Sequence, residues 1–330
     1  MKKILILGGG FSKERAISLD TANSVLKALR KKNYKAIICE PNGKLIKKIK
    51  SFKPDVVFNA LHGRFGEDGY IQTILETLKV KYTHSGVLAS YIAMDKEISK
   101  KIFIKNKIKT PKYFKYKFDK NNIIKKKIIF KVKKKLKFPV VIKPINEGSS
   151  VNVCICNEKN LIKNLKKLSQ YKEILIEEFI PGREIQVAIL GKKKLGVIEL
   201  KPKRKFYDYE AKYNSKAGTK HIIPVKLGEK YLNNVMSIAL KAHNLIGCKG
   251  VTRSDFRFNK GKFYLLETNT QPGMTNLSLV PEIAAYSGMS FIDLIEWIIK
   301  YASITIKKKK IIFLFIIINS IRHPNSKKSK

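Results

Sequence analysis

Three oxygen-bearing side chains in the last quarter of the chain have the types and the spacing of a metal site. Glu267 and Asn269 are two residues apart in a strand-like run, so their side chains lie on one face of the strand, and Asp255 lies in the strand-like run before it. Carboxylate and amide oxygens suit Mg²⁺, which proteins commonly hold through a few carboxylates together with substrate phosphates. The residues predict a magnesium site, although taken alone they are equally typical of a solvated sheet edge.

Two basic residues could neutralise phosphate near such a metal. Arg253 is two residues before Asp255 and is expected on the same strand face, where a guanidinium can stabilise developing negative charge. Lys143 ends an apolar run, and the Glu-Gly-Ser-Ser loop at 147–150 exposes backbone N–H groups that can cradle phosphate together with a lysine. The chain has no Walker A pattern, and such a loop is by itself more often only a turn.

His62 lies in a loop, residues 61–69, that is dense in glycine and charge and directly follows a strand-like run. In open α/β sheets, ligands bind just beyond the carboxyl ends of the strands. A lone histidine would more often be structural, but this setting makes His62 a candidate site residue. The Gly8-Gly9-Gly10 turn lacks a full Gly-x-Gly-x-x-Gly pattern and is poor evidence for a dinucleotide site.

The elements that must position these residues change character along the chain. The first hundred residues alternate strands and helices, which predicts a parallel sheet with right-handed crossovers. The expected strands are 4–7, 36–39 and 56–59, and the expected helices are 14–31, 71–78 and 87–94.

Beyond a Lys-rich stretch at 96–137, which we take as the domain joint, the pattern becomes α+β with antiparallel strands. An Asn-Lys-Gly turn at 259–261 predicts a hairpin that would carry Asp255 and Glu267. The expected strands are 138–144, 174–179, 184–190, 195–200, 254–258 and 262–267.

The charge balance is extreme, with 69 Lys and Arg against 25 Asp and Glu, a net +44. Such a charge suggests nucleic acid or an anionic membrane. We favour compositional drift, because the excess is mostly Lys, accompanied by Ile and Asn, and its runs lack interleaved aromatics. No specific nucleic-acid partner is therefore predicted.

The cysteines and the N-terminal segment indicate the cellular compartment of the protein. The four cysteines, Cys39, Cys154, Cys156 and Cys248, are scattered and lack the spacing of a disulfide scaffold or a zinc site. The apolar run after Lys2 and Lys3 stops within four residues at glycine, too short for a signal peptide. We expect a cytoplasmic protein.

The C-terminal extension, residues 305–330, has a short apolar run at 311–318 between lysine clusters. A membrane-spanning helix needs about 20 apolar residues, so this run does not span. Adhesion to an anionic membrane surface is an alternative, but stable anchoring normally needs two signals, and we favour a non-functional extension.

Taken together, the motifs resemble the D-alanine–D-alanine ligases of the ATP-grasp superfamily, from residue 4 to about residue 297. The matching segments occur in the family's order. They are GGFSKERAIS at 9–18, LHGRFGEDGYIQ at 61–72, SGVLAS at 85–90 leading to MDK at 94–96, KP at 143–144 with EGSSV at 147–151, FYDYEAKY at 206–213 and ETNTQPGMT at 267–275.

The resemblance implies a fold of the α/β and α+β kind, the ATP-grasp fold. Its parts would be an N-terminal parallel α/β substrate-binding domain (1–95), a central ATP-grasp subdomain (96–180) and a C-terminal catalytic subdomain (181–304), the two α+β domains enclosing the nucleotide. The implied activity is ATP-dependent ligation of two D-alanines through an acyl phosphate, for peptidoglycan precursors. The implied partners are ATP, D-alanine, two Mg²⁺ ions (or Mn²⁺) and a second subunit of a homodimer.

The resemblance also implies a role for each matching residue. The nucleotide would contact Lys96, Lys143, Glu177, Glu178, Phe179, Ile180, Glu184, Phe206 and Lys212, and the metal ions would bind Asp255, Glu267 and Asn269. The donor pocket and the reacting groups would be Glu14, His62, Ser149, Tyr213, Arg253 and the Gly273 N–H. The acceptor's carboxylate would be held by Lys212, Ser278 and Leu279.

Two departures and two rivals accompany the resemblance. Ser254 replaces a small hydrophobic residue on the far strand face, and Asn152 replaces a glycine, which would stiffen or shift the phosphate loop. One rival is a different ligation, such as D-alanine with D-lactate. The other is a basic binding protein that keeps the fold without activity, against which the intact lysine, arginine and metal positions argue.

Overall fold

The computed structural model describes residues 1–304 except 119–123, 125–126, 149–150, 202–218 and 276. Its N-terminal part is a parallel three-stranded sheet in the order β2-β1-β3, as predicted. The residues Ile4 to Leu7 are fully buried, which explains why the first strand is a continuous apolar run. The elements are β1 (Lys3–Leu7), α1 (Arg15–Arg30), β2 (Lys35–Cys39), α2 (Leu45–Phe52), β3 (Val56–Asn59), α3 (Tyr70–Thr77) and α4 (Val87–Met94).

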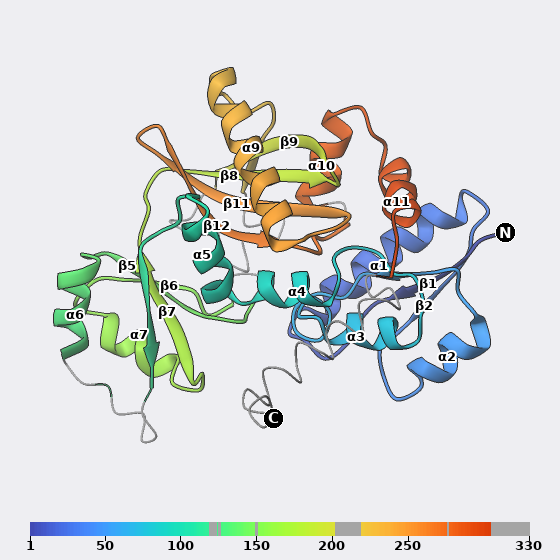
Figure 1. Ribbon diagram of the computed structural model, residues 1–330, viewed down its shortest axis with the longest axis horizontal. Helices are drawn as coiled ribbons and strands as arrows, with labels where there is room; N and C mark the ends of the chain where they lie inside the picture. The colour runs from blue at the N-terminus through green and yellow to red at the C-terminus, as the bar shows by residue number, and fades with distance from the viewer. Residues whose placement is uncertain (119–123, 125–126, 149–150, 202–218, 276, 305–330) are drawn as a thin grey trace, which may run out of the picture.

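A four-stranded antiparallel sheet in the order β4-β7-β5-β6 follows, at the left of Figure 1. Helices α6 and α7 bury Val132 and Leu165 in one apolar cluster with Ile142 and Ile176 of the sheet. The elements are α5 (Lys96–Lys105), β4 (Tyr113–Lys117), α6 (Lys127–Lys135), β5 (Val140–Pro144), β6 (Cys154–Cys156), α7 (Leu161–Lys167) and β7 (Glu173–Glu178).

The third sheet is five-stranded and antiparallel, in the order β10-β9-β8-β11-β12. The predicted hairpin is confirmed: β11 and β12 meet at Lys260 and Gly261, which both have positive φ, as a tight two-residue hairpin turn requires. The elements are β8 (Arg183–Leu190), β9 (Lys193–Lys201), β10 (Lys220–Ile222), α9 (Glu229–Ile246), β11 (Val251–Asn259), β12 (Lys262–Asn269), α10 (Leu279–Tyr286) and α11 (Phe291–Lys300).

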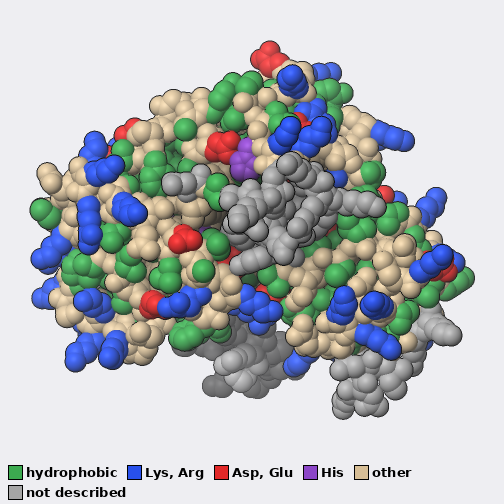
Figure 2. Space-filling model, turned by 180° about the vertical axis from the view of Figure 1, so that it is seen from behind, with side chains coloured by type: hydrophobic (Ala, Val, Ile, Leu, Met, Phe, Trp, Pro, Cys, Tyr) green, Lys and Arg blue, Asp and Glu red, His purple; other side chains and the backbone are tan. Residues whose placement is uncertain are grey.

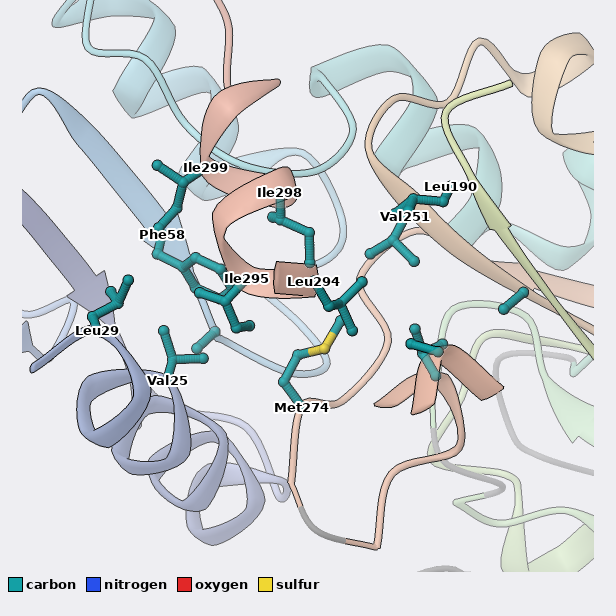
Figure 3. Close-up of a cluster of buried hydrophobic side chains, with 14 of the residues drawn as sticks. Val25, Leu29, Phe58, Leu190, Val251, Met274, Leu294, Ile295, Ile298 and Ile299 are labelled. Carbon is teal, nitrogen blue, oxygen red and sulfur yellow. The ribbon is translucent and has the colours of Figure 1, made fainter. Parts of the chain in front are cut away.

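One apolar core joins the N-terminal sheet to the five-stranded sheet. Val25 and Phe58 from the first region pack in the same cluster as Leu294 of α11 and Met274, which follows β12 (Figure 3). Each of these side chains is at most 2% exposed. The first and last regions of the chain are therefore held together by continuous packing, not by a linker.

The distribution of basic side chains on the surface and the state of the cysteines agree with the sequence-based expectations. Lys and Arg side chains are spread over the face shown in Figure 2 and do not form a single stripe. The four cysteines are free thiols. Within the described residues, no helix combines the length and the apolar character needed to cross a membrane.

Candidate active site

Two adjoining pockets collect the predicted site residues, and they share Lys96, Glu147 and Glu267 in their walls. Four predicted residues, Ser149, Phe206, Lys212 and Tyr213, lie outside the described residues. Pocket A is lined by the predicted residues Glu14, His62, Lys96, Arg253, Glu267, Asn269, Gly273, Ser278 and Leu279. Pocket B is lined by Lys96, Lys143, Glu177, Glu178, Phe179, Ile180, Glu184, Asp255 and Glu267.

The strand pair β11–β12 places the predicted metal ligands in register. Asp255 is opposite Glu267 in the ladder and Arg253 is opposite Asn269, so the four side chains share one face. Arg253 binds Asp255 through two hydrogen bonds, from Nε to Oδ1 at 2.8 Å and from Nη2 to Oδ2 at 3.1 Å. The paired spacing therefore brings a guanidinium, two carboxylates and an amide together, as predicted.

This donor set fits Mg²⁺ with phosphate better than a metal held by protein alone. Within the described part of the chain, no group of three or more His, Cys, Asp or Glu residues could hold a metal ion. Two carboxylates and one amide leave coordination positions that phosphate oxygens and water fill in nucleotide sites. Glu267 lies in the walls of both pockets, at the place where such a phosphate would bridge them.

Lys96 is positioned by the start of α5. Asp95 caps the helix, accepting hydrogen bonds from the N–H groups of Glu97 and Ile98 at 2.9 Å each. The Lys96 Nζ then lies 2.6 Å from the carbonyl oxygen of Glu147 and 3.2 Å from Glu267 Oε2. One ammonium thus connects the predicted phosphate loop to the predicted metal ligands.

Lys143 belongs to a buried ion-pair chain that the sequence did not reveal. Its Nζ lies 2.6 Å from Glu177 Oε1, and the Nζ of Lys100 lies 3.0 Å from Glu177 Oε2 and 2.6 Å from Thr110 Oγ1. Burial lowers the pKa of Lys100 to about 8. Burial alone would raise the pKa of Glu177, but the two ammonium groups bring it below its usual value. Glu177 therefore offers its side chain to two lysines, besides the backbone contact predicted for it.

The far end of pocket B contains a second unpredicted residue, Arg257. Its Nη1 lies 3.2 Å from Glu184 Oε2, and its Nε and Nη2 donate to the carbonyls of Ile180 at 3.1 Å and Gly182 at 2.7 Å. Arg257 thus orients the predicted ribose-binding carboxylate. Its spacing from Asp255 was the available signal, since residues two apart on a strand share a face.

The N-terminal wall of pocket A is a set of buried polar groups. Glu14 precedes α1 and is 6% exposed. The ring of His62 is held on both sides, with Nε2 3.0 Å from Thr21 Oγ1 and Nδ1 3.4 Å from Glu67 Oε1. Burial raises the pKa of Glu67, and the neighbouring Glu14 carboxylate adds to that rise. Glu67 lines the pocket as well, although only its motif, and not its role, was singled out from the sequence.

Glycines let the loops approach this wall closely. A Cβ on Gly148 would lie 3.2 Å from Glu14 Oε2, and one on Gly273 would lie 2.8 Å from Ser278 Oγ. Ser278 Oγ accepts a hydrogen bond from the N–H of Thr275 at 2.9 Å and immediately precedes α10, which begins at Leu279. The N-terminus of a helix is a favourable place for a carboxylate. Pocket A can therefore hold an amino acid against Glu14 and His62 and a second carboxylate near α10.

Family models and known proteins match most of this chain. Residues 40–85 match the family model described as "D-ala D-ala ligase N-terminus", and residues 102–300 match "D-ala D-ala ligase C-terminus". The D-alanine–D-alanine ligase of Pelagibacter ubique (strain HTCC1062) is 70% identical over 303 residues, covering 92% of this chain and 99% of the relative. That of Wolbachia pipientis wMel is 44% identical over 302 residues, covering 90% of this chain and 93% of the relative.

Solved structures agree with the sequence relatives. The D-alanine–D-alanine ligase of Bacillus anthracis complexed with ATP superposes with a TM-score of 0.78 at 30% identity, covering 91% of this chain and 97% of that one. A second structure of the Bacillus anthracis enzyme gives a TM-score of 0.80 at 34% identity, with the same coverage. The expected ATP-grasp arrangement of α/β and α+β regions is therefore confirmed.

Proposed function

The chain belongs to the D-alanine–D-alanine ligase family, and from this premise we propose how its two pockets work. The reaction is the ATP-dependent joining of two D-alanines into D-alanyl-D-alanine, a precursor of peptidoglycan. The observation that carries the assignment is the shared wall of Lys96, Glu147 and Glu267. This shared wall supports binding of a nucleotide in pocket B with its phosphate end against an amino acid in pocket A.

Pocket B would hold ATP. The adenine would contact the backbone of residues 177–180, Glu184 would receive the ribose hydroxyls, and Lys96 and Lys143 would bind phosphate oxygens. Each of these residues lines the pocket. The predicted subdomains 96–180 and 181–304 would enclose the nucleotide, and the predicted domain 1–95 would bind the amino-acid substrate. Phe206 and Lys212 would complete its surroundings from the segment that follows β9.

Two Mg²⁺ ions, for which Mn²⁺ would substitute, would be held by Asp255, Glu267 and Asn269. Bound there, the ions would supply charge neutralisation to the phosphates. Lys96 approaches Glu267 to 3.2 Å, so the same carboxylate would orient both its lysine and its metal ion.

The first step would activate the donor. Its ammonium would bind Glu14 and its carboxylate oxygen would attack the γ-phosphorus of ATP, releasing ADP and forming an acyl phosphate. Phosphoryl transfer depends mainly on positioning and charge neutralisation. Arg253 and the N–H of Gly273, both in pocket A, would stabilise the negative charge that develops on the donor.

The second step would form the peptide bond. The neutral amine of the acceptor would attack the acyl carbonyl, inorganic phosphate would leave with both electrons of the broken C–O bond, and the amine would lose a proton. Lys212, Ser278 and Leu279 would hold the acceptor's carboxylate. Residues 206–220 would act as a lid that excludes water, with Tyr213 contacting Ser149 and Glu14. We also propose a homodimer located in the cytoplasm.

The assignment is tested by phosphate release with ATP, Mg²⁺ and a panel of D-amino and D-hydroxy acids, the products being identified by mass spectrometry. D-alanine alone should give D-alanyl-D-alanine, with release abolished when ATP or Mg²⁺ is withheld. A depsipeptide as the main product from D-alanine plus D-lactate would identify the alternative ligation. No turnover with any member of the panel, together with salt-sensitive nucleic-acid binding, would support the inactive binding protein.

A further inference from the structure

Gln271 connects the metal-ligand strand to the N-terminal sheet through three hydrogen bonds. It follows β12 and is 1% exposed. Its backbone N–H donates to Asn269 Oδ1 at 2.7 Å, its side-chain Nε2 donates to the carbonyl of Leu61, and its Oε1 accepts from Asn59 Nδ2 at 2.6 Å. The two residues that its side chain contacts are more than 200 positions earlier in the chain.

Asn59, at the end of β3, also forms hydrogen bonds to the loop that carries His62, residues 61–69. It is fully buried, its Nδ2 also donates to the carbonyl of Gly66 at 3.0 Å, and its Oδ1 accepts from the N–H of Leu61 at 3.3 Å. The loop is therefore held by hydrogen bonds at two points, Leu61 and Gly66. His62, which lines pocket A, lies between these two points.

The residues of this polar link are close in sequence to the apolar core that joins the same two regions, and Figure 3 shows that core. Met274, three residues after Gln271, is fully buried in that core with Phe58, the neighbour of Asn59. Apolar contact resists separation of the regions but does not fix their register sharply, whereas hydrogen bonds are directional. Every donor of the Asn59 amide is used, so the link adds geometry without leaving that side chain's donors unpaired.

Resting on the function proposed above, we propose that Gln271 is a positioning residue for the donor D-alanine, setting the His62 loop against Asn269 and Gly273. One side of the donor pocket comes from the N-terminal sheet and the other from the end of β12, so neither region alone defines it. A shifted His62 loop would lose charge-assisted hydrogen bonds to the donor, and the loss of one such bond lowers affinity roughly 10- to 100-fold. The nucleotide in pocket B does not depend on this register, because its predicted contacts come from the other two sheets and α5.

The first test is Gln271→Met, which keeps the length of the side chain and removes its amide. Initial rates are fitted with separate constants for the two D-alanines and for ATP. The KM of the donor D-alanine should rise roughly 10- to 100-fold, because the donor loses hydrogen bonds when it binds, while the KM of ATP stays within about twofold. An unchanged donor KM, or a fall in kcat with both KM values unchanged, overturns the proposal. Absence of ligation by the wild-type protein would instead overturn the proposed function.

A second variant separates positioning from stability. Gln271→Met leaves one N–H of the Asn59 amide buried without its Gln271 acceptor, which is costly, whereas Asn59→Leu with Gln271→Met removes that donor together with the acceptor. The double variant should recover much of the thermal stability and keep the raised donor KM. Recovery of the donor KM together with stability would show a purely structural role and contradict the proposal.

The matched control is Thr252→Val. Thr252 is fully buried on β11 and lines neither pocket, and its Oγ1 lies 2.8 Å from Nδ1 of His243 on α9. Thr252→Val should lower the melting temperature without moving the donor KM. A donor KM raised equally by this control would mean that any loss of stability has the effect, and would overturn the proposal.

Discussion

The two walls of the site are built in different ways. Asp255 and Glu267 lie on neighbouring strands in register, and β8 continues the ladder beyond β11. The phosphate loop is instead held by side chains: the Glu147 carbonyl accepts from Lys96 Nζ, and Tyr171 accepts from Asn152 Nδ2 at 2.7 Å. In the proposed mechanism, the groups that stay fixed during phosphoryl transfer lie on the ladder, whereas the described residues of the loop that would admit a nucleotide are held by a few polar contacts that can be broken singly.

The largest loss of activity is expected when the β11–β12 strand pair loses the negative charge of Glu267. Glu267→Gln keeps the size of the side chain and removes one carboxylate from a site that would gather two divalent cations against triphosphate. Ligation should fall by at least about 100-fold, with the fold preserved by circular dichroism and the loss partly relieved at high Mg²⁺. Activity is followed by phosphate release.

A matched carboxylate variant serves as the control for Glu267. Glu173→Gln also removes a strand carboxylate that is paired with a lysine, Lys115, at 3.0 Å, but it lies outside both pockets. Its turnover should stay near that of the wild type. Wild-type turnover by Glu267→Gln at ordinary Mg²⁺ would falsify the metal assignment and remove the contrast between the two walls.

Local sequence was enough to predict the metal-ligand strands. Period two assigns Arg253 and Asp255 to one face of their strand and Glu267 and Asn269 to one face of theirs, and the hairpin turn at 259–261 predicts that the two strands pair. In the first ninety-five residues, three strands and three helices were predicted from apolar runs and helical spacing, with bounds within one residue of those observed, whereas α2 (Leu45–Phe52) was missed.

Residues whose partners are distant in sequence could not be found in this way. Lys100 is held by Glu177, 77 positions later, and Gln271 is held by Asn59, 212 positions earlier. Nothing within a window of neighbouring residues distinguishes such a lysine or glutamine from one on the surface. The roles assigned to Ser149, Phe206, Lys212 and Tyr213 stay predictions, because these residues lie outside the described part of the chain.

Substitution of Lys100 tests whether ATP binding near the phosphate loop depends on the buried ion pair between Lys100 and Glu177. Lys100→Met fills the same space but leaves Glu177 with Lys143 as its remaining lysine partner. The KM for ATP should rise roughly tenfold, since one charge-assisted hydrogen bond is worth about 1.4 kcal/mol or more. Lys101→Met is the control, because Lys101 is exposed on the same helix and pairs with Glu97 at 2.8 Å. Equal KM values for the two variants would contradict the expectation.

The lowered pKa of Lys100 predicts that the stability of the protein depends on pH. Burial lowers the pKa of Lys100 to about 8, from 10.5 in the unfolded chain. Between these values the unfolded chain binds the proton more tightly, so the free energy of unfolding gains a contribution that rises with pH from about 8 to 10.5. Chemical denaturation of the wild type and of Lys100→Met across this range should show a difference that changes in that direction. A pH-independent difference would mean that Lys100 is not titrating there.

A smaller effect is expected from the loop itself. Asn152 has φ 58° and donates to the hydroxyl of Tyr171, which in turn bonds Glu147 Oε1 at 3.3 Å. Asn152→Gly suits this backbone conformation but releases the link, so the loop should order less readily and the KM for ATP should rise about two- to fivefold. Asn33→Gly, also at positive φ (57°) but in an exposed turn, is the control for the backbone effect. A KM unchanged by Asn152→Gly would show that the side chain does not restrain the loop.

The smallest effect is expected beyond both walls, at the C-terminal extension. The described packing reaches the residues just before it: α11 ends at Lys300, and the N–H of Ser303 donates to the carbonyl of Tyr82 at 3.1 Å. The matching family model ends at residue 300, and the Pelagibacter ubique relative is 99% covered by 92% of this chain. Truncation after Ile306 should therefore leave the ligation rate within about twofold, the range of surface changes away from structural contacts. Turnover, sedimentation and membrane fractionation of the truncated and full-length proteins test this. Loss of turnover or of dimers would make the extension part of the working enzyme, and membrane association that disappears with it would assign it the anchoring role.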